Sequence, residues 1–214
     1  MSSTSEVIAK IPFDRKLLPQ DFHMPGIEPW IAAIIRQHKP SLVLDLGVGM
    51  GFWGFLIKSY IARDLNEEPI LIGVDIDVKK LMQLKKMNIY DELICSDIRY
   101  LPFKVKAFNM VIAIESLYMK EFWNVIRDIE TLIDNDGLII LSRGFKEEIR
   151  KRLLSEGYDV YRVYLRGLIL TRLNNGEDFF ATKEAKYIAP IIKVLYKMVR
   201  VKARDYTIAI KSSH

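Results

Sequence analysis

Three glycines at alternate positions directly follow an apolar run that carries an acid, and this segment has the clearest chemical potential in the chain. It spans residues 42–51, with Asp45 in the apolar run and Gly47, Gly49 and Gly51 after it. Because glycine has no Cβ, a backbone at these positions turns tightly and approaches a ligand closely. A helix that begins after such a loop adds oriented N–H groups and the positive end of its dipole. We expect a ligand-binding turn between a strand and a helix, although a plain tight turn fits the same residues.

Two further acids stand where apolar runs end. Asp75 lies 24 residues after Gly51, and Asp97 lies 22 residues after Asp75. A carboxylate after the second strand accepts hydrogen bonds from ribose hydroxyls in dinucleotide folds, and one after the next strand is placed to accept a bond from an exocyclic amine. Ile76 and Ile98, which follow the two acids, are candidates to flank an adenine. Each acid alone is commonly a helix cap or a solvated loop residue, but one ligand that touches all three loops accounts for the set.

The elements that position these residues alternate between strands and helices. Hydrophobic periodicity and breaker residues predict strands at 41–46, 69–76, 93–96, 108–114, 138–142, 158–165 and 206–211, and helices at 25–38, 52–65, 78–87, 120–133, 146–155 and 183–200. Strands joined through helices form right-handed units of a parallel sheet whose two faces are both covered. We therefore predict a doubly wound, mostly parallel α/β sheet. Ligands of such sheets bind beyond the carboxyl ends of the strands, here at residues 45–51, 75–77, 96–98 and 115–118.

Together these motifs resemble those of the class I S-adenosylmethionine-dependent methyltransferases. The glycine loop is similar to the first motif of that family, and Asp45 stands at its acidic position. The resemblance implies that Asp75 binds the ribose hydroxyls and that Asp97, which a Leu-Pro-Phe segment at 101–103 follows, contacts the adenine amine. It implies S-adenosylmethionine as the cofactor, and a seven-stranded sheet with helices on both faces and an antiparallel last strand. It covers about residues 25–165 and the final strand.

The chain departs from the family pattern at two positions. Asn109, in a segment that resembles the family's F-D-x-V strand, stands where aspartate is usual. Asp136 replaces one glycine of the turn that usually reads L-x-P-G-G. These departures put the roles of the usual residues in doubt, and they leave open a methyltransferase-like module that binds RNA or a protein partner without catalysis. The intact cofactor motifs favour the enzyme.

A nicotinamide-dependent oxidoreductase is a third reading of the same glycine loop. The dinucleotide fingerprint G-x-G-x-x-G, counted from Gly47, requires a glycine at position 52, which is Phe52. The chain also offers no plausible partner for hydride transfer. Both observations disfavour this reading.

The family's reaction displaces a methyl group directly from a sulfonium, so placing the acceptor in line with that methyl supplies most of the catalysis. Many members also use a general base on the acceptor. Glu115, at the end of the fourth predicted strand, is the candidate base, and a helix cap or a partner for the cofactor's amino end is its alternative role. Trp53 and Tyr118 are candidates for the acceptor pocket or for the core. The acceptor (a small molecule, RNA or a protein) is not specified by these motifs.

Composition excludes several other classes of protein. The single cysteine, Cys95, rules out disulfide frameworks and cysteine-rich zinc sites, and we expect it to be a small buried hydrophobe. The three histidines are far apart in the sequence, and no metal site is expected. No apolar run reaches the roughly 18 residues that a membrane helix needs, and residues 1–10 lack the pattern of a secretory signal. A cytoplasmic protein is the expectation.

Charge is spread unevenly along the chain. Residues 143–214 hold 16 Lys and Arg against 8 Asp and Glu, whereas the other 142 residues hold 16 against 19. We divide the chain into an N-terminal arm at 1–24 and a methyltransferase domain at 25–214, in which residues 166–204 form a basic insertion or lid before the last strand. The basic segment is a candidate surface for nucleic acid or another anion.

The predicted helix of this insertion is amphipathic. One face gathers apolar side chains, namely Tyr187, Ile188, Ile191, Ile192, Leu195, Met198 and Val199. Three roles fit: a lid that packs this face on the sheet, an RNA surface that combines lysines with nearby aromatic side chains, and a helix that lies on an anionic membrane.

Overall fold

The computed structural model describes residues 29–61, 68–117, 122–142, 147–165, 169–174, 176–180, 183–198 and 205–211. The N-terminal arm predicted at 1–24, the pocket candidate Tyr118 and the end of the basic segment at 199–204 lie outside these residues, as do parts of several predicted helices.

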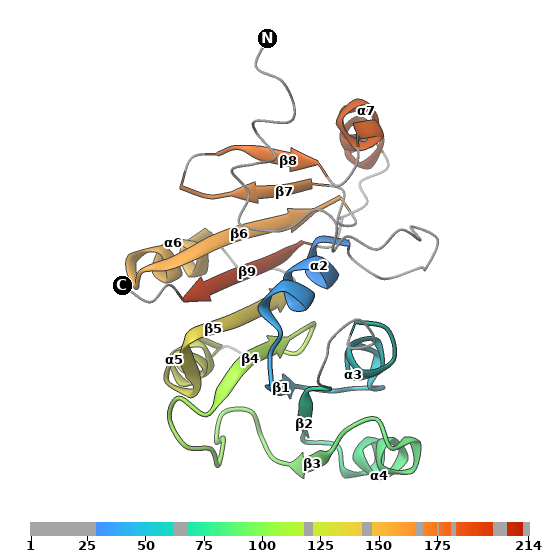
Figure 1. Ribbon diagram of the computed structural model, residues 1–214, viewed down its shortest axis with the longest axis vertical. Coiled ribbons are helices and arrows are strands. Elements are labelled where there is room, and N and C mark those ends of the chain that lie inside the picture. The colour runs from blue at the N-terminus through green and yellow to red at the C-terminus, as the bar shows by residue number, and fades with distance from the viewer. Residues whose placement is uncertain are drawn as a thin grey trace.

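The strands of the described residues form one mixed sheet in the order β3-β2-β1-β4-β5-β9-β6-β7-β8 (Figure 1). The parallel half consists of β1 (Leu42–Leu46), β2 (Ile70–Asp75), β3 (Glu92–Cys95), β4 (Phe108–Ala113) and β5 (Ile133–Ser142). The antiparallel half consists of β9 (Tyr206–Lys211), β6 (Tyr158–Tyr164), β7 (Ile169–Arg172) and β8 (Asp178–Phe180).

The prediction of a seven-stranded sheet is wrong, because the described residues alone supply nine strands. The two additional strands, β7 and β8, come from the segment that was predicted as an insertion, and they extend the sheet beyond β6. The alternation of apolar and polar residues that predicts a strand is weak in β7 and β8, because both strands are short. The last strand, β9, lies between β5 and β6 and runs antiparallel to both.

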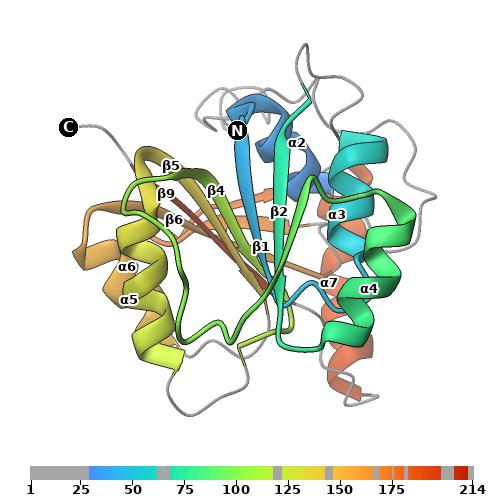
Figure 2. The ribbon, with the colours of Figure 1, turned by 90° about the horizontal axis from the view of Figure 1, so that it is seen from below.

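Helices cover both faces of the parallel half of the sheet (Figure 2). On one face lie α2 (Pro29–His38), α3 (Phe52–Leu56) and α4 (Val78–Met87), and on the other lie α5 (Phe122–Leu132) and α6 (Glu147–Ser155). Two clusters of buried apolar side chains correspond to these layers: Val43 of β1 belongs to the cluster of α2 and α4, and Leu44 belongs to that of α5 and α6. β1 is apolar on both sides for this reason.

Strand order places a cleft at the centre of the parallel half. The chain passes from β1 outward to β2 and β3, and then returns to the other side of β1 to form β4 and β5. In open α/β sheets the connections after two such neighbouring strands diverge, and ligands bind beyond their carboxyl ends. The reversal between β1 and β4 therefore points to the edge where the predicted site residues lie.

The helix predicted at 52–65 has a different form in the structure. α3 ends at Leu56 and continues as a wider π-helical turn, η2 (Ile57–Ile61). Ile57 and Ile61 are both fully buried in the cluster of α2 and α4. A π-turn has more than four residues per turn, so it keeps two side chains that are four positions apart on the same face.

The turn predicted at Asn135-Asp136-Gly137 lies inside β5 as an irregularity of pairing. Phe108 of β4 pairs with Ile133, whereas Met110 pairs with Leu138. Extra residues of β5 therefore bulge out opposite one residue of β4. A Cβ on Gly137 would lie 2.2 Å from Cγ1 of Ile133, so this bulge requires glycine.

Of the three roles considered for the insertion, the lid whose apolar face packs on the sheet does not fit the exposure of the described residues. α7 (Lys183–Met198) contacts β8 at the end of the sheet farthest from β3 (Figure 1). Most of the predicted face is exposed, namely Tyr187, Ile188, Ile191, Leu195 and Met198. Ile192 packs against the protein, and Val199 lies outside the described residues. Sequence periodicity locates an apolar face but cannot show which side of the helix meets the protein.

Candidate functional site

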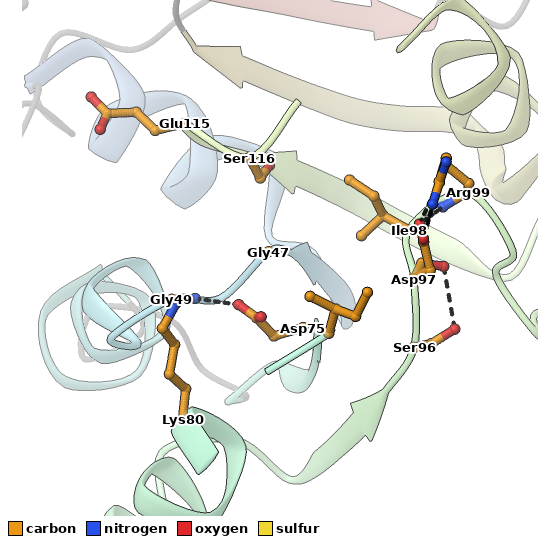
Figure 3. Close-up of a pocket in the computed structure, with 11 residues that line it drawn as sticks. Gly47, Gly49, Asp75, Lys80, Ser96, Asp97, Ile98, Arg99, Glu115 and Ser116 are labelled. Atoms are coloured by element: carbon orange, nitrogen blue, oxygen red, sulfur yellow. Dashed lines mark hydrogen bonds and ion pairs between the residues drawn. The ribbon is translucent and has the colours of Figure 1, made fainter. Parts of the chain in front are cut away.

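The carboxyl ends of the four strands β1 to β4 meet at a cavity of about 440 Å³ (Figure 3). Eleven residues line it: Gly47, Gly49, Asp75, Ile76, Lys80, Ser96, Asp97, Ile98, Arg99, Glu115 and Ser116. Seven of the nine predicted site residues are among them. The other two do not line this cavity: Asp45 lies in β1, and Gly51 lies at the end of the glycine loop.

The glycine loop turns through three left-handed residues. Gly47, Gly49 and Gly51 have φ angles of 75°, 53° and 76°, a region that other residues enter only with strain. A Cβ on Gly47 would lie 2.4 Å from Cβ of Ser116, so the loop after β1 packs directly on the segment after β4. A Cβ on Gly51 would lie 2.5 Å from Cδ2 of Leu84, so this glycine allows the start of α3 to pack on α4.

Asp75 connects the end of β2 to the glycine loop. Its Oδ2 accepts a hydrogen bond of 2.9 Å from the N–H of Gly49, and its Oδ1 accepts one of 2.9 Å from the N–H of Asp77. The residue is 7% exposed. A carboxylate has about four acceptor positions, so each oxygen keeps a position for a further donor. Asp75 is thus a fixed, prearranged acceptor in the wall of the cavity.

Asp97 is held by a cation that the sequence patterns did not single out. The guanidinium of Arg99 donates to both carboxylate oxygens, with distances of 3.0 Å from Nε to each oxygen, and the Arg99 N–H donates to Oδ1 at 2.9 Å. The side-chain bonds from Arg99 lower the pKa of Asp97. Figure 3 shows the two side chains together on the side of the cavity away from Glu115. An amine that binds Asp97 therefore competes with Arg99.

Two isoleucines give this part of the cavity its apolar surface. Ile98 is 8% exposed and belongs to the core cluster of α5 and α6, whereas Ile76 is 69% exposed. Both line the cavity, each directly after one of the two acids. A planar apolar group that lies between them would cover the exposed side chain of Ile76.

Asp45 is a buried acid under the loop. The hydroxyl of Tyr90 donates to its Oδ2 at 2.6 Å, and burial raises the pKa of Asp45 to about 7. The negative charge of Asp75 acts in the same direction, while the bond from Tyr90 opposes it. Sequence reasoning missed Tyr90, whose ring also fills the space that glycine leaves at Gly54.

A second cavity of about 450 Å³ adjoins the first and shares Gly47, Gly49 and Glu115 with it. Its remaining lining is Asp45, Val48, Met50, Phe52, Trp53 and Ile114. Trp53 lies edge-on against Tyr206 with ring centroids 6.0 Å apart, so it joins the core to this cavity. The space combines acids with apolar and aromatic walls, next to the end of β4.

Glu115 stands at the boundary between the two cavities. Its φ of 54° is left-handed, which is uncommon outside glycine. Its N–H donates to Oγ of Ser142 at 2.9 Å, so the end of β5 holds this conformation. Strained backbone of this kind persists where surrounding structure fixes it, and often at functional sites.

Sequence reasoning found the strand-end loops but missed part of the lining. Ser96 and Ser116 lie within the inspected ranges 96–98 and 115–118, yet no role was assigned to them. Lys80 and Arg99 were missed because a basic residue in a helix or after an acid is usually solvated. Among the described residues, Ser116 Oγ is a buried hydroxyl for which no hydrogen-bond partner is found.

The two departures from the family pattern lie away from the cavity. Oδ1 of Asn109 accepts bonds from the N–H of Leu42 at 3.0 Å and from the Ser41 hydroxyl at 2.5 Å, so it joins the start of β4 to the start of β1. Asp136 is exposed in the bulge at the start of β5. Neither position bears on the residues at the carboxyl ends.

The expectation of a buried Cys95 is wrong, because its side chain is exposed. β3 is an edge strand, and its last residue has a neighbouring strand on one side only. The position of a strand within a sheet is not readable from a local apolar run.

The described residues contain no group of three or more His, Cys, Asp or Glu placed to hold a metal ion. None of their helices has the length and apolar character needed to cross a membrane.

Comparison with known proteins identifies the fold. No family model matches the chain. An uncharacterized protein of Methanocaldococcus jannaschii is 25% identical over 126 residues, which are 59% of this chain and 51% of that protein, so the chain spans about half the length of this curated relative. The plantazolicin methyltransferase BpumL in complex with SAH has a TM-score of 0.58 and 15% identity, with 98% of this chain and 89% of that one covered. The (4+2)-cyclase SpnF has a TM-score of 0.57 and 15% identity, with coverage of 92% and 86%.

These two proteins share the fold of this chain over most of their length, but one is a cyclase and the other a methyltransferase. Fold alone therefore does not fix the activity. Together, the strand order and the structural matches show that this chain has the fold of the class I S-adenosylmethionine-dependent methyltransferases.

Proposed function

We propose that this chain is an S-adenosylmethionine-dependent methyltransferase whose acceptor is a small molecule, RNA or a protein. One observation carries the proposal: the glycine loop and the acids Asp75 and Asp97, from three successive loops, line one cavity that adjoins a second one. The cytoplasmic location expected from the sequence stays a prediction, and the basic segment stays a candidate surface for nucleic acid.

The first cavity suits the nucleoside part of the cofactor. Asp75 has acceptor positions for two ribose hydroxyls, because its present partners are single N–H groups on each oxygen. Ile76 and Ile98 offer apolar faces to the adenine, and Asp97 accepts from its amine once Arg99 has moved aside. Gly47 and Gly49 allow the ligand to approach the backbone closely.

The second cavity suits the end of the cofactor that carries the methyl group, together with the acceptor. S-adenosylmethionine supplies a methyl group that is activated by the attached sulfonium. Phe52 and Trp53 exclude water and orient an acceptor by contact with its apolar parts. Glu115, at the boundary of the two cavities, accepts the proton that an acceptor N–H or O–H loses as the methyl is transferred. Its fixed backbone supports a defined position for this carboxylate.

Label transfer from methyl-labelled S-adenosylmethionine tests the proposal. The protein is incubated with separated small-molecule, RNA and protein fractions of a cell extract, and the label is followed into each fraction. We expect label in one fraction with the natural protein and a loss of at least about 100-fold with Asp75→Ala, because two bonds to a charged group contribute about 1.5 kcal/mol each or more. Asp136→Ala, at an exposed acid away from the cavity, should transfer label normally.

A different result would favour the non-catalytic alternative. If folded protein transfers no label and does not bind the cofactor, but binds RNA in a salt-dependent way, the chain is a methyltransferase-like binding module. The fold by itself does not exclude that outcome, since one fold can serve unrelated functions, and here it also occurs in a cyclase.

A further inference from the structure

α7 presents an unusual exposed apolar surface. Six large apolar side chains are between 46% and 75% exposed: Tyr187, Ile188, Ile191, Val194, Leu195 and Met198. We refer to these six residues as the α7 stripe. Their spacing places them on one side of a helix of 16 residues, about 24 Å long. A large contiguous apolar surface on a folded protein commonly marks an interaction site.

The helix is held so that the α7 stripe points outward. Ala185 and Ala189 are buried, and Ala189 and Ile192 pack in a small cluster with Leu165 and Ile169. Ala185, Ala189 and Ile192 are spaced three or four positions apart, so they lie on one narrow face of the helix. Two of these three inward-facing side chains are alanines, and the larger apolar side chains of the α7 stripe lie on the exposed part of the helix.

A row of lysines borders the α7 stripe. At 100° per residue, Lys183, Lys186, Lys193 and Lys197 fall in a single arc between the stripe and the buried face. Lys193 lies 3.7 Å from a carboxylate oxygen of Asp178 and 5.1 Å from the Tyr164 ring centroid, and it thereby braces α7 against the sheet. The other three extend the positive charge along the helix.

We infer that α7 docks on an anionic lipid surface. A helix with large apolar side chains on one face and lysines beside them lies in the interface of a bilayer, with its apolar face at the boundary of the headgroups. Negative headgroups attract each nearby lysine. Among the described residues no helix is suited to cross a membrane, so the contact is peripheral.

Other occupants fit the α7 stripe less well. RNA recognition relies on aromatic rings that stack on bases, whereas five of the six stripe side chains are aliphatic or thioether. Two copies of α7 packed stripe to stripe in antiparallel orientation would bring two lysine rows together, and Glu184 is the single acid in the helix to offset them. An anionic lipid surface can contact both the apolar stripe and the lysines of the helix.

Co-flotation with lipid vesicles tests the inference without any cofactor. The full chain is mixed with phosphatidylcholine vesicles, with or without 30 mole percent phosphatidylglycerol as an illustrative content, roughly enough to give a negative surface. We expect flotation with the anionic vesicles alone, weakened by high salt. Ile191→Glu with Leu195→Glu should abolish it. Lys183→Glu with Lys186→Glu should weaken binding at least about 25-fold, because each lysine contributes a factor of about five.

Matched substitutions on another basic helix serve as controls. Met82→Glu with Met87→Glu on α4 replaces two exposed apolar residues, and Lys85→Glu with Lys86→Glu reverses two lysines. Both control variants should float like the natural protein, and thermal melting should show that all four variants are folded. Equal flotation of the Ile191/Leu195 variant, or no flotation of the natural protein, would overturn the inference. A dimer in sedimentation that this variant converts to a monomer would do so as well.

Discussion

The hydroxyl of Tyr90 donates a hydrogen bond of 2.6 Å to Oδ2 of Asp45, and this bond joins the segment just before β3 to β1. The ring of Tyr90 reaches this position because Gly54 and Gly73 have no side chain: a Cβ at these glycines would lie 2.4 Å and 2.8 Å from Tyr90 atoms. The acid of the first motif is therefore tied into the core under the loop, while Asp75 and Asp97 line the cavity.

The raised pKa of Asp45 predicts a pH dependence of stability. An aspartate in the unfolded chain has its ordinary pKa of 3.8, whereas burial raises the pKa of folded Asp45 to about 7. The folded state thus binds more protons between these values, and the free energy of unfolding falls as pH rises through this window, by about 4 kcal/mol in total. Asp45→Asn does not titrate and should lack this fall.

Urea unfolding at pH 4.5 and pH 7.5 measures this difference. Asp136→Asn, at an exposed acid, should keep the fall seen in the natural protein. Identical pH dependence of the natural protein and Asp45→Asn would show that Asp45 is charged in the folded state throughout the window.

Gly47→Ala should destabilise the protein more than Gly157→Ala. Both glycines have left-handed φ angles, 75° and 84°, which cost another residue about 1–2 kcal/mol. A Cβ on Gly157 meets nothing within 4 Å, whereas one on Gly47 lies 2.4 Å from Ser116. Overpacking adds about 1–3 kcal/mol at Gly47.

The variant Gly47→Ala with Ser116→Gly separates the two causes. It removes the contact at Ser116 but keeps the backbone strain, so its free energy of unfolding should return toward that of Gly157→Ala. No recovery in chemical denaturation would mean that the contact with Ser116 is not what makes Gly47 necessary.

Arg99→Ala should tighten the binding of S-adenosylhomocysteine several-fold. Arg99 occupies both oxygens of Asp97, and an adenine amine must replace it. The ion pair is partly exposed, with side chains 43% and 21% accessible, so its loss should change the free energy of unfolding by less than about 1 kcal/mol.

Calorimetry compares this variant with Arg127→Ala, at an arginine of α5 that bonds to Asn124 outside the cavity. The control should bind like the natural protein. Weaker binding by Arg99→Ala would show that Arg99 contacts the ligand directly.

Glu115→Gln should leave the affinity for S-adenosylmethionine within about threefold. A base acts on the acceptor and contributes little to cofactor binding, whereas loss of a charge-assisted bond to the cofactor's ammonium would weaken binding about tenfold or more. Glu148→Gln, at an exposed acid of α6, is the matched control. A tenfold loss with Glu115→Gln alone would assign this residue to the cofactor.

Much of the parallel half of the fold was predictable from the sequence, because each strand ends in a distinct local signal. The apolar run before Gly47 and the acids Asp75 and Asp97 are contiguous motifs, and parallel strands bring their carboxyl ends to one edge. Seven predicted residues line one cavity as a result.

The remaining features depend on tertiary contacts. The pairing of Arg99 with Asp97 depends on the rotamers of the two side chains. The hydrogen bond from Tyr90 to Asp45 joins residues 45 positions apart in the chain. Cys95 is exposed because β3 lies at an edge of the sheet. The orientation of α7 depends on Ala185 and Ala189, whose small side chains carry little weight in a hydrophobic pattern.

Binding of S-adenosylmethionine to the purified protein, measured by calorimetry with NAD and the Asp75→Ala variant as controls, tests the central claim most directly. The account predicts saturable binding of S-adenosylmethionine, no binding of NAD, and a loss of at least about 100-fold in Asp75→Ala. Absence of binding to well-folded protein, or equal binding by Asp75→Ala, would contradict it.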